Sequence, residues 1–229
     1  MTIFIRLILA HLFTDLVIFR RFIFDIKQKS RIFGYLLHAL LFALCVLALC
    51  LPYMNMVWIS FKGITLNGWQ TLPLLAIAHT AADIAGKTSG RFSAVLFVLW
   101  QIVIVTILFL AFPPLRSSGA SEYWENFLII VCGALFVTYF IMTLIYFIEK
   151  DLAGECKPDF DVNYANMLIR LALFLLLLAP GFIGWVLGAL WVAFVFADSS
   201  LRGFDISPAR IYVGLPLTVI AGALVKYFF

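Results

Sequence analysis

Histidine and aspartate recur at one spacing in the first half of the chain. His11 is followed by Asp15, and His79 is followed by Asp83, so the members of each pair are four residues apart. On a helix, this spacing places both side chains on one face, one turn apart. The chain has one further histidine, His38, which lies between these two pairs in the sequence. Imidazole nitrogens and carboxylate oxygens together are the ligands that suit Zn²⁺, Fe²⁺ or Mn²⁺, so these residues predict metal chemistry.

The elements that hold these residues must lie in a lipid bilayer. The chain has 229 residues, of which 65% are hydrophobic and only 12% are charged. Soluble domains are about half apolar and about a quarter charged, so lipid must solvate part of this apolar surface. The net charge of +4 comes from basic residues gathered between the apolar runs. That pattern is typical of membrane topology and predicts no nucleic-acid partner.

The apolar runs predict an all-α, polytopic transmembrane helix bundle of eight helices. Because a bilayer core needs about 20 apolar helical residues, the stretch 166–197 is too long for one crossing. Pro180-Gly181 near its middle is a turn signal that predicts a hairpin of two short helices. The alternative is one kinked helix, which gives seven helices in total. The remaining predicted helices are 3–19, 32–53, 70–86, 92–113, 127–148 and one from Ser207-Pro208 to about Tyr227.

The two halves of the chain differ in chemistry. Residues 1–113 form a predicted four-helix membrane domain that contains every histidine. Residues 114–229 contain further helices, which we interpret as a scaffold or as a docking surface for a membrane-protein partner. Gly184 and Gly188 form a GxxxG pattern there, which allows close packing of helices, most simply within the chain. The charges of this half, Arg170 and Arg210 among them, lie near predicted helix ends and are typical of interface anchors.

The basic segment 20–31 orients the first domain. It contains Arg20, Arg21, Lys27, Lys29 and Arg31 against a single acidic residue, Asp25. The positive-inside rule places this segment in the cytoplasm and the N-terminus outside.

Measured from the basic residues, six polar side chains fall in one layer of the membrane. At 1.5 Å per helical residue they lie about 6–15 Å from the cytoplasmic ends of their helices. An ionisable group inside a membrane helix costs about 2.5–3.5 kcal/mol on insertion scales, so it usually faces the bundle interior and pairs. The six predicted members of this layer are His11, Asp15, His38, His79, Asp83 and Gln101.

These residues predict an open metal site near the cytoplasmic face. The metal ligands would come from His11, Asp15, His38, His79 and Asp83. Three or four protein ligands and one water make a catalytic type of site, because the metal makes its water a nucleophile. Asp15 or Asp83, whichever is spare, would act as general base or orient a histidine. The substrates would be amides, esters or phosphodiesters of lipids.

Other functions remain open on the same residues. The His/Asp pairs are also expected in a non-catalytic subunit of a larger membrane complex, where they would satisfy each other by hydrogen bonds. A third hypothesis is proton or ion transport, since such chains relay protons. The polar layer lies on one side only, which argues against transport. Haem binding through His11, His38 and His79 is also conceivable, although a carboxylate four residues from two of them argues against it.

The first 110 residues or so resemble an uncharacterised bacterial membrane family, catalogued as a domain of unknown function. The family's pattern is an "aHllaDf" helix, a histidine on the next helix, an HxxxD helix and an "lDQxxH" helix. His11 to Asp15, His38, and His79 to Asp83 match the first three elements. Only Gln101 remains of the fourth, where Trp100 and Ile104 replace the family's Asp and His. The resemblance implies one functional cluster and a bacterial inner-membrane location, but no established activity.

Overall fold

The computed structural model describes most of the chain, and the described residues form eight long helices and one hairpin. The described ranges are 2–17, 26–27, 29–85, 93–112, 122–153, 164–202 and 209–227. The helices are α1 (Thr2–Leu12) continued by η1 (Phe13–Val17), α3 (Arg31–Cys50), α4 (Gly68–Ala85), α5 (Ser93–Ala111), α6 (Glu122–Leu135) continued by η3 (Phe136–Phe140) and α7 (Ile141–Ala153), α8 (Tyr164–Leu177), α9 (Ile183–Arg202), and η4 (Arg210–Gly214) continued by α10 (Leu215–Tyr227).

The predicted all-α fold with eight helices is confirmed, including the hairpin in the second half. α8 ends at Leu177, a turn follows, and α9 begins at Ile183. Gly181 in this turn has a φ of 61°, a value that glycine adopts without strain. Several helices are longer than their apolar cores predict. α6 begins at Glu122 instead of 127, and α9 continues to Arg202 instead of 197.

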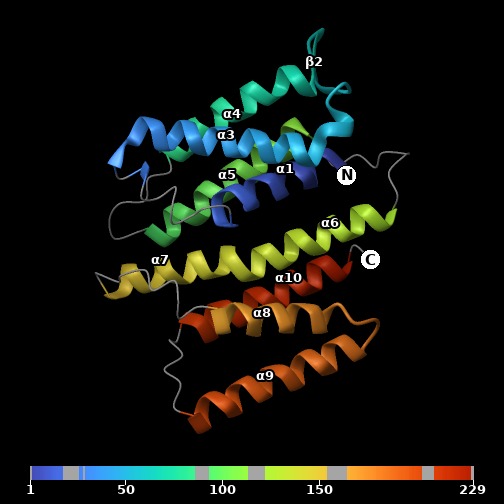
Figure 1. Cartoon of the computed structure of the whole chain (residues 1–229). Coiled ribbons are helices and arrows are strands. Elements are labelled where there is room, and N and C mark those ends of the chain that lie inside the picture. The colour runs from blue at the N-terminus through green and yellow to red at the C-terminus, as the bar shows by residue number, and fades with distance from the viewer. Residues whose placement is uncertain are drawn as a thin grey trace. The chain divides into compact units, whose positions relative to one another are not determined.

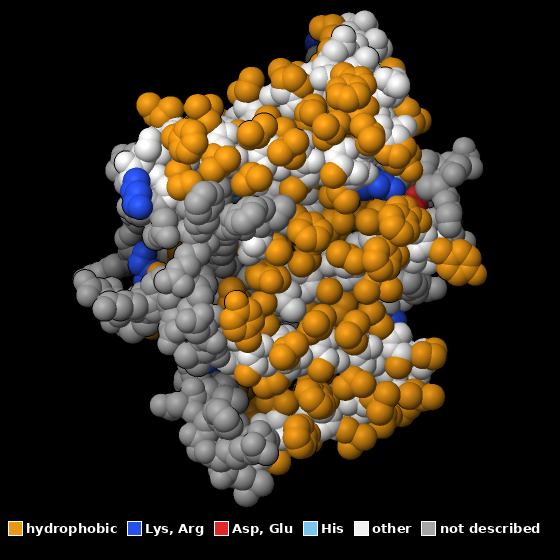
Figure 2. Space-filling model, viewed as in Figure 1, with side chains coloured by type: hydrophobic (Ala, Val, Ile, Leu, Met, Phe, Trp, Pro, Cys, Tyr) orange, Lys and Arg blue, Asp and Glu red, His pale blue; other side chains and the backbone are white. Residues whose placement is uncertain are grey.

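Four of the described helical segments are long and apolar enough to cross a bilayer. They are Ile32–Tyr53, Ser93–Ala111, Tyr123–Leu152 and Arg210–Tyr227, while Tyr164–Leu177 and Ile183–Ala197 are shorter apolar helices. Their outward side chains are apolar as well. In α5, for example, Leu99, Ile102 and Leu110 are exposed, and Figure 2 shows apolar side chains spread over the helices on the visible face. The chain is therefore a multi-pass membrane protein.

The chain divides into two compact units. Unit 1 is Met1–Thr88 with Leu96–Leu128, and unit 2 is Ser89–Val95 with Ile129–Phe229.

Unit 1 packs α3 against both α1 and α4 (Figure 1). Its buried core takes residues from three helices, such as Leu7 of α1, Val46 of α3 and Leu108 of α5. Arg6 of α1 is buried and donates to the carbonyl of Leu49, which ties α1 to the end of α3. This packing holds α1, α3 and α4 side by side, and the three helices carry all the histidines.

A β-hairpin joins α3 to α4, where the sequence predicted only a polar stretch. β1 (Val57–Phe61) pairs antiparallel with β2 (Ile64–Asn67). Lys62 and Gly63 between the strands have φ values of 45° and 84°, as a two-residue type I′ turn requires. The backbone N–H of Gln70 donates to the side chain of Asn67, and the Asn67 N–H donates to the Gln70 side chain, both at 3.0 Å. This reciprocal pair caps the start of α4.

Unit 2 packs α8 against α9 and α10, and two glycines allow the close approach. Gly188 of α9 and Gly222 of α10 both lie against Leu177, so that an added Cβ would stand 2.7 Å and 2.9 Å from its side-chain atoms. Lys226 then donates to the carbonyls of Ala179 and Gly181, each at 2.7 Å, after the end of α8. The second glycine of the GxxxG pattern therefore serves packing within the chain.

Candidate metal centre

All six side chains of the predicted polar layer lie in unit 1, and their contacts link them into one network. His11 and Asp15 come from the α1–η1 helix, because the four-residue spacing puts them on one face. His38 lies seven residues into α3. Its neighbour α4 runs antiparallel beside it and contributes His79 and Asp83, and α5 contributes Gln101. Residues from four separate helices thus meet at one place.

The centre of the network is a triangle of three potential ligand atoms. Oδ1 of Asp15 lies 3.2 Å from Nε2 of His38 and 3.2 Å from Nε2 of His79. The two Nε2 atoms are also 3.2 Å apart. Each neutral imidazole carries one N–H. The two rings therefore supply at most two donors, and the triangle has three sides, so hydrogen bonds between these atoms cannot account for all three contacts.

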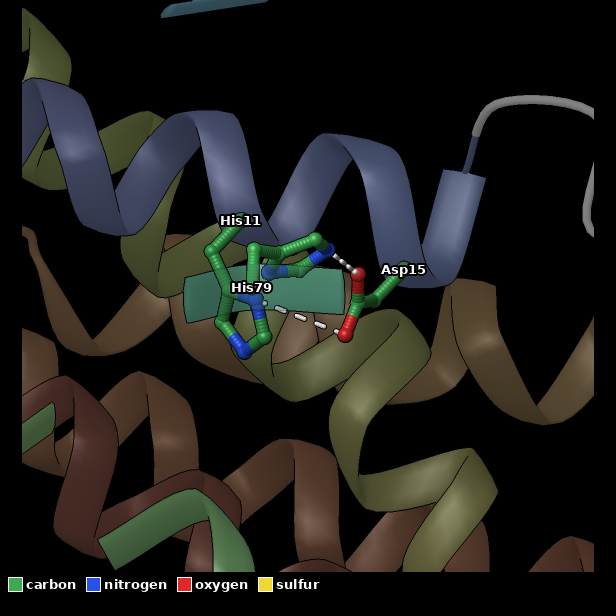
Figure 3. Close-up of side chains that lie close together, drawn as sticks. All are labelled: His11, Asp15 and His79. Carbon is green, nitrogen blue, oxygen red and sulfur yellow. Dashed lines mark ion pairs between the residues drawn. The ribbon is translucent and has the colours of Figure 1, made fainter. Parts of the chain in front are cut away.

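His11 lies on the other side of the same carboxylate. Its Nδ1 is 3.4 Å from Oδ2 of Asp15, and its Nε2 is 2.9 Å from Oε1 of Gln101. Figure 3 shows His11 and His79 directed at different oxygens of Asp15. Gln101 therefore fixes the His11 ring, and that ring faces Asp15. His11, Asp15 and His79 also each offer a ligand atom within 4.8 Å of the other two.

Asp83 lies at the edge of the cluster and has a partner of its own. Its Oδ2 forms an ion pair with Nζ of Lys27 and lies 3.9 Å from Nε2 of His38. Lys27 also lies 5.2 Å from the centre of the Tyr35 ring, a cation–π distance. Asp83 is thus held just outside the triangle by a positive charge.

The histidine rings are buried, whereas the carboxylates are open on one side. The side chains of His38 and His79 are 6% exposed, and that of Asp15 is 25% exposed. Phe42, one turn after His38, stacks on the His79 ring with the ring centres 4.1 Å apart and the planes 10° from parallel. The apolar core of unit 1 therefore fixes the His79 ring, and the side chains of Asp15 and Asp83 are partly exposed.

Several buried polar atoms of the cluster lack a well-aligned hydrogen bond. Among the described residues, Nδ1 of His11, Oδ1 of Asp15 and Nδ1 of His38 have none. A buried polar atom without a partner costs about 1–3 kcal/mol. A cation bound at Oδ1 of Asp15 would relieve part of this cost.

Three features of the site were not predicted from the sequence. Lys27 was assigned only to the basic segment that sets topology. Phe42 has no distinguishing signal in an apolar helix. The π-helical turn η1, Phe13–Val17, contains Asp15, and such turns occur frequently at functional sites. Arg20 and Arg21 of the basic segment lie outside the described residues.

No family model matches the chain, and comparisons with the curated proteins and with the solved structures found no similar protein. The resemblance of the first 110 residues to the uncharacterised bacterial family stays a prediction.

Proposed function

We propose that unit 1 holds a divalent metal ion and hydrolyses a bond in a lipid-like substrate. Asp15, His38 and His79 would bind the ion, and His11 would position Asp15 through its contact with the second carboxylate oxygen. The observation that carries this proposal is the triangle of three ligand atoms with 3.2 Å sides.

The size of the triangle favours a metal over hydrogen bonds alone. Zinc binds imidazole nitrogen at about 2.0–2.1 Å in tetrahedral geometry, which sets its ligand atoms about 3.3 Å apart. The sides of the triangle have nearly this length, so an ion fits with little movement of the side chains. Three protein ligands leave a fourth position for water or substrate, as in catalytic zinc sites.

The reaction that fits this site is addition of water across an ester, amide or phosphodiester bond. A bound divalent ion would supply Lewis-acid polarisation and a water of lowered pKa. The oxygen of water goes to the carbonyl carbon or the phosphorus, and the bond to the leaving oxygen or nitrogen breaks. Asp83 is the carboxylate outside the triangle, so it is placed to take the proton of the water and return it to the leaving group. The reaction is a redox-neutral hydrolysis, and water is its only co-substrate.

The location of the site in a membrane protein favours lipids as the substrate class. The ligands lie on helices of a multi-pass membrane protein, and the carboxylates are the exposed part of the cluster. With the basic segment 20–31 in the cytoplasm and the N-terminus outside, the opening would face the headgroup region of the inner leaflet.

Substitution of Lys27 tests whether Asp15 binds the metal while Asp83 stays outside its ligand shell. Lys27→Gln removes a positive charge near the ion and frees Asp83 to enter the fourth position. We expect zinc affinity to rise about tenfold, equivalent to ~1.4 kcal/mol, and turnover to fall. A competition titration with a fluorescent zinc chelator measures the affinity. Lys29→Gln removes the same charge from an exposed position nearby and should leave the affinity unchanged; equal affinities in all three proteins would contradict the role of Lys27.

Vesicles test the reaction itself. The purified chain would be reconstituted with zinc or manganese in vesicles of phosphatidylethanolamine and phosphatidylglycerol, and the lipids would be followed by mass spectrometry. We expect metal-dependent release of a hydrolysis product, which a chelator stops and added metal restores. Bound metal without cleavage of these lipids would contradict hydrolysis of membrane phospholipids. Absence of metal together with a co-purifying membrane protein would favour the assembly-subunit hypothesis.

A further inference from the structure

A second buried charge lies in unit 2, away from any histidine. The side chain of Arg170 on α8 is 3% exposed, so the interpretation of this residue as an interface anchor is wrong. Its Nε donates to the carbonyl of Val137 at 2.9 Å, and its Nη2 donates to the carbonyl of Thr138 at 3.3 Å. Both carbonyls belong to the π-helical turn η3. Among the described residues, no carboxylate pairs with Arg170.

Arg170 lines a pocket between α8, α9 and η4. The pocket is a half-open depression, and its empty space is about 370 Å³ only when the open solvent at its mouth is included. Its polar lining is Asn166, Arg170 and Arg210, and its apolar lining includes Val195, Phe196 and Leu215. The indole of Trp191 on α9 donates to the carbonyl of Ile169 at 3.1 Å, which joins the two helices beside the pocket.

The described residues that line the pocket carry an excess of positive charge. Arg210 forms an ion pair with Glu149, with Nε and Oε1 3.5 Å apart. Two guanidinium groups therefore line the pocket, and Glu149 compensates for one of them. Arg170 is buried and Arg210 is partly exposed; like charges repel each other more strongly where water is excluded, so an anion bound between the arginines would stabilise the pocket.

We propose that this pocket binds the phosphate group of an anionic membrane lipid. Guanidinium groups pair with phosphate oxygens through two parallel hydrogen bonds, and Asn166 adds a further donor. The apolar side of the pocket would contact the acyl chain. The proposal concerns unit 2 and does not depend on the metal site of unit 1.

The position of the charges along their helices fits a headgroup. Arg170 lies six residues after the start of α8 at Tyr164, about 9 Å along the helix. Arg210 begins η4, and Glu149 is four residues from the end of α7. Arg210 and Glu149 therefore lie toward helix ends, while Arg170 lies near the middle of the 14-residue helix α8, so the headgroup phosphate would enter from the side of Arg210. Basic pockets between membrane helices bind anionic headgroups in this way.

Arg210→Gln tests the proposal, because it removes one guanidinium and keeps a polar side chain. Delipidated protein in dodecyl maltoside would be titrated with phosphatidylglycerol, and binding would be followed by native mass spectrometry. We expect about one tightly bound lipid per wild-type chain and at least about tenfold weaker binding to the variant, the loss of one charge-assisted pair. Lys62→Gln, which removes one positive charge from the hairpin of unit 1, should bind as the wild type does.

Melting temperatures of the wild-type chain distinguish a lipid phosphate from free inorganic phosphate as the ligand. Phosphatidylglycerol should raise the melting temperature more than zwitterionic phosphatidylcholine, and inorganic phosphate should raise it little. Equal effects of inorganic phosphate and phosphatidylglycerol would overturn a lipid ligand. Equal lipid binding by wild type and Arg210→Gln would overturn the pocket. If Arg210→Gln loses helical content, Asn166→Leu replaces it, with several-fold weaker binding expected.

Discussion

Asp15→Asn is expected to abolish metal binding while the protein keeps its fold. Oδ1 of Asp15 belongs to two of the three sides of the ligand triangle, and Oδ2 faces His11. An amide has nearly the same shape but lacks the negative charge, so its oxygen is a much weaker ligand for a divalent ion than a carboxylate oxygen. Loss of a residue that merely supports a ligand costs about 10–100-fold in metal affinity, so loss of this carboxylate should cost more than about 100-fold.

The affinity of Asp15→Asn is measured by competition with a zinc-selective fluorescent chelator, beside circular dichroism and gel filtration as checks of folding. Cys132→Ala is the control, because it removes a thiol, another type of metal ligand, from unit 2. This control should bind zinc as the wild type does. A folded Asp15→Asn protein with wild-type affinity would rule out the carboxylate as a ligand.

Gly188→Leu is expected to destabilise unit 2 strongly. A Cβ at Gly188 would lie 2.7 Å from Cδ2 of Leu177, and Leu177 is itself 2% exposed and packed in the core of this unit. Overpacking of this kind costs about 1–3 kcal/mol. The next residue provides the control, because Ala189 is exposed on the same helix, so Ala189→Leu should cost less than about 0.5 kcal/mol.

Unfolding by sodium dodecyl sulfate in mixed micelles measures both variants. We expect unfolding at a lower detergent concentration for Gly188→Leu and an unchanged midpoint for Ala189→Leu. Had the glycines served a dimer instead, Gly188→Leu would dissociate an oligomer without changing the monomer's midpoint. That result would contradict their role within the chain.

The sequence was informative where a physical rule acts locally. Apolar runs of bilayer length predicted eight helices, and Pro180-Gly181 predicted the turn between α8 and α9. The spacing of His11 and Asp15 predicted a shared helix face. The cost of charge in lipid then predicted that residues from four helices would meet, and their contacts follow that prediction.

The remaining features depend on contacts between distant residues. Lys27 pairs with Asp83 across 56 positions of sequence, and a basic segment gives no sign of which acid it will meet. Arg170 resembles an interface anchor until the carbonyls of η3 are known to lie beside it. The hairpin turn is Lys62-Gly63, whereas the dipeptides that best predict such turns are Asn-Gly and Asp-Gly. The pair Asn67 and Gln70, however, was a readable signal for the start of α4.

Metal content tests most directly whether unit 1 holds a metal ion. Wild type and Asp15→Asn would be purified in detergent without chelator or metal-affinity resin, and their metals counted by inductively coupled plasma mass spectrometry. We expect about one zinc, iron or manganese ion per wild-type chain, as a single three-ligand site requires, and background levels in Asp15→Asn. No metal in the wild type, even after incubation with these ions, would contradict a metal centre, and the His/Asp network would then be a set of structural hydrogen bonds.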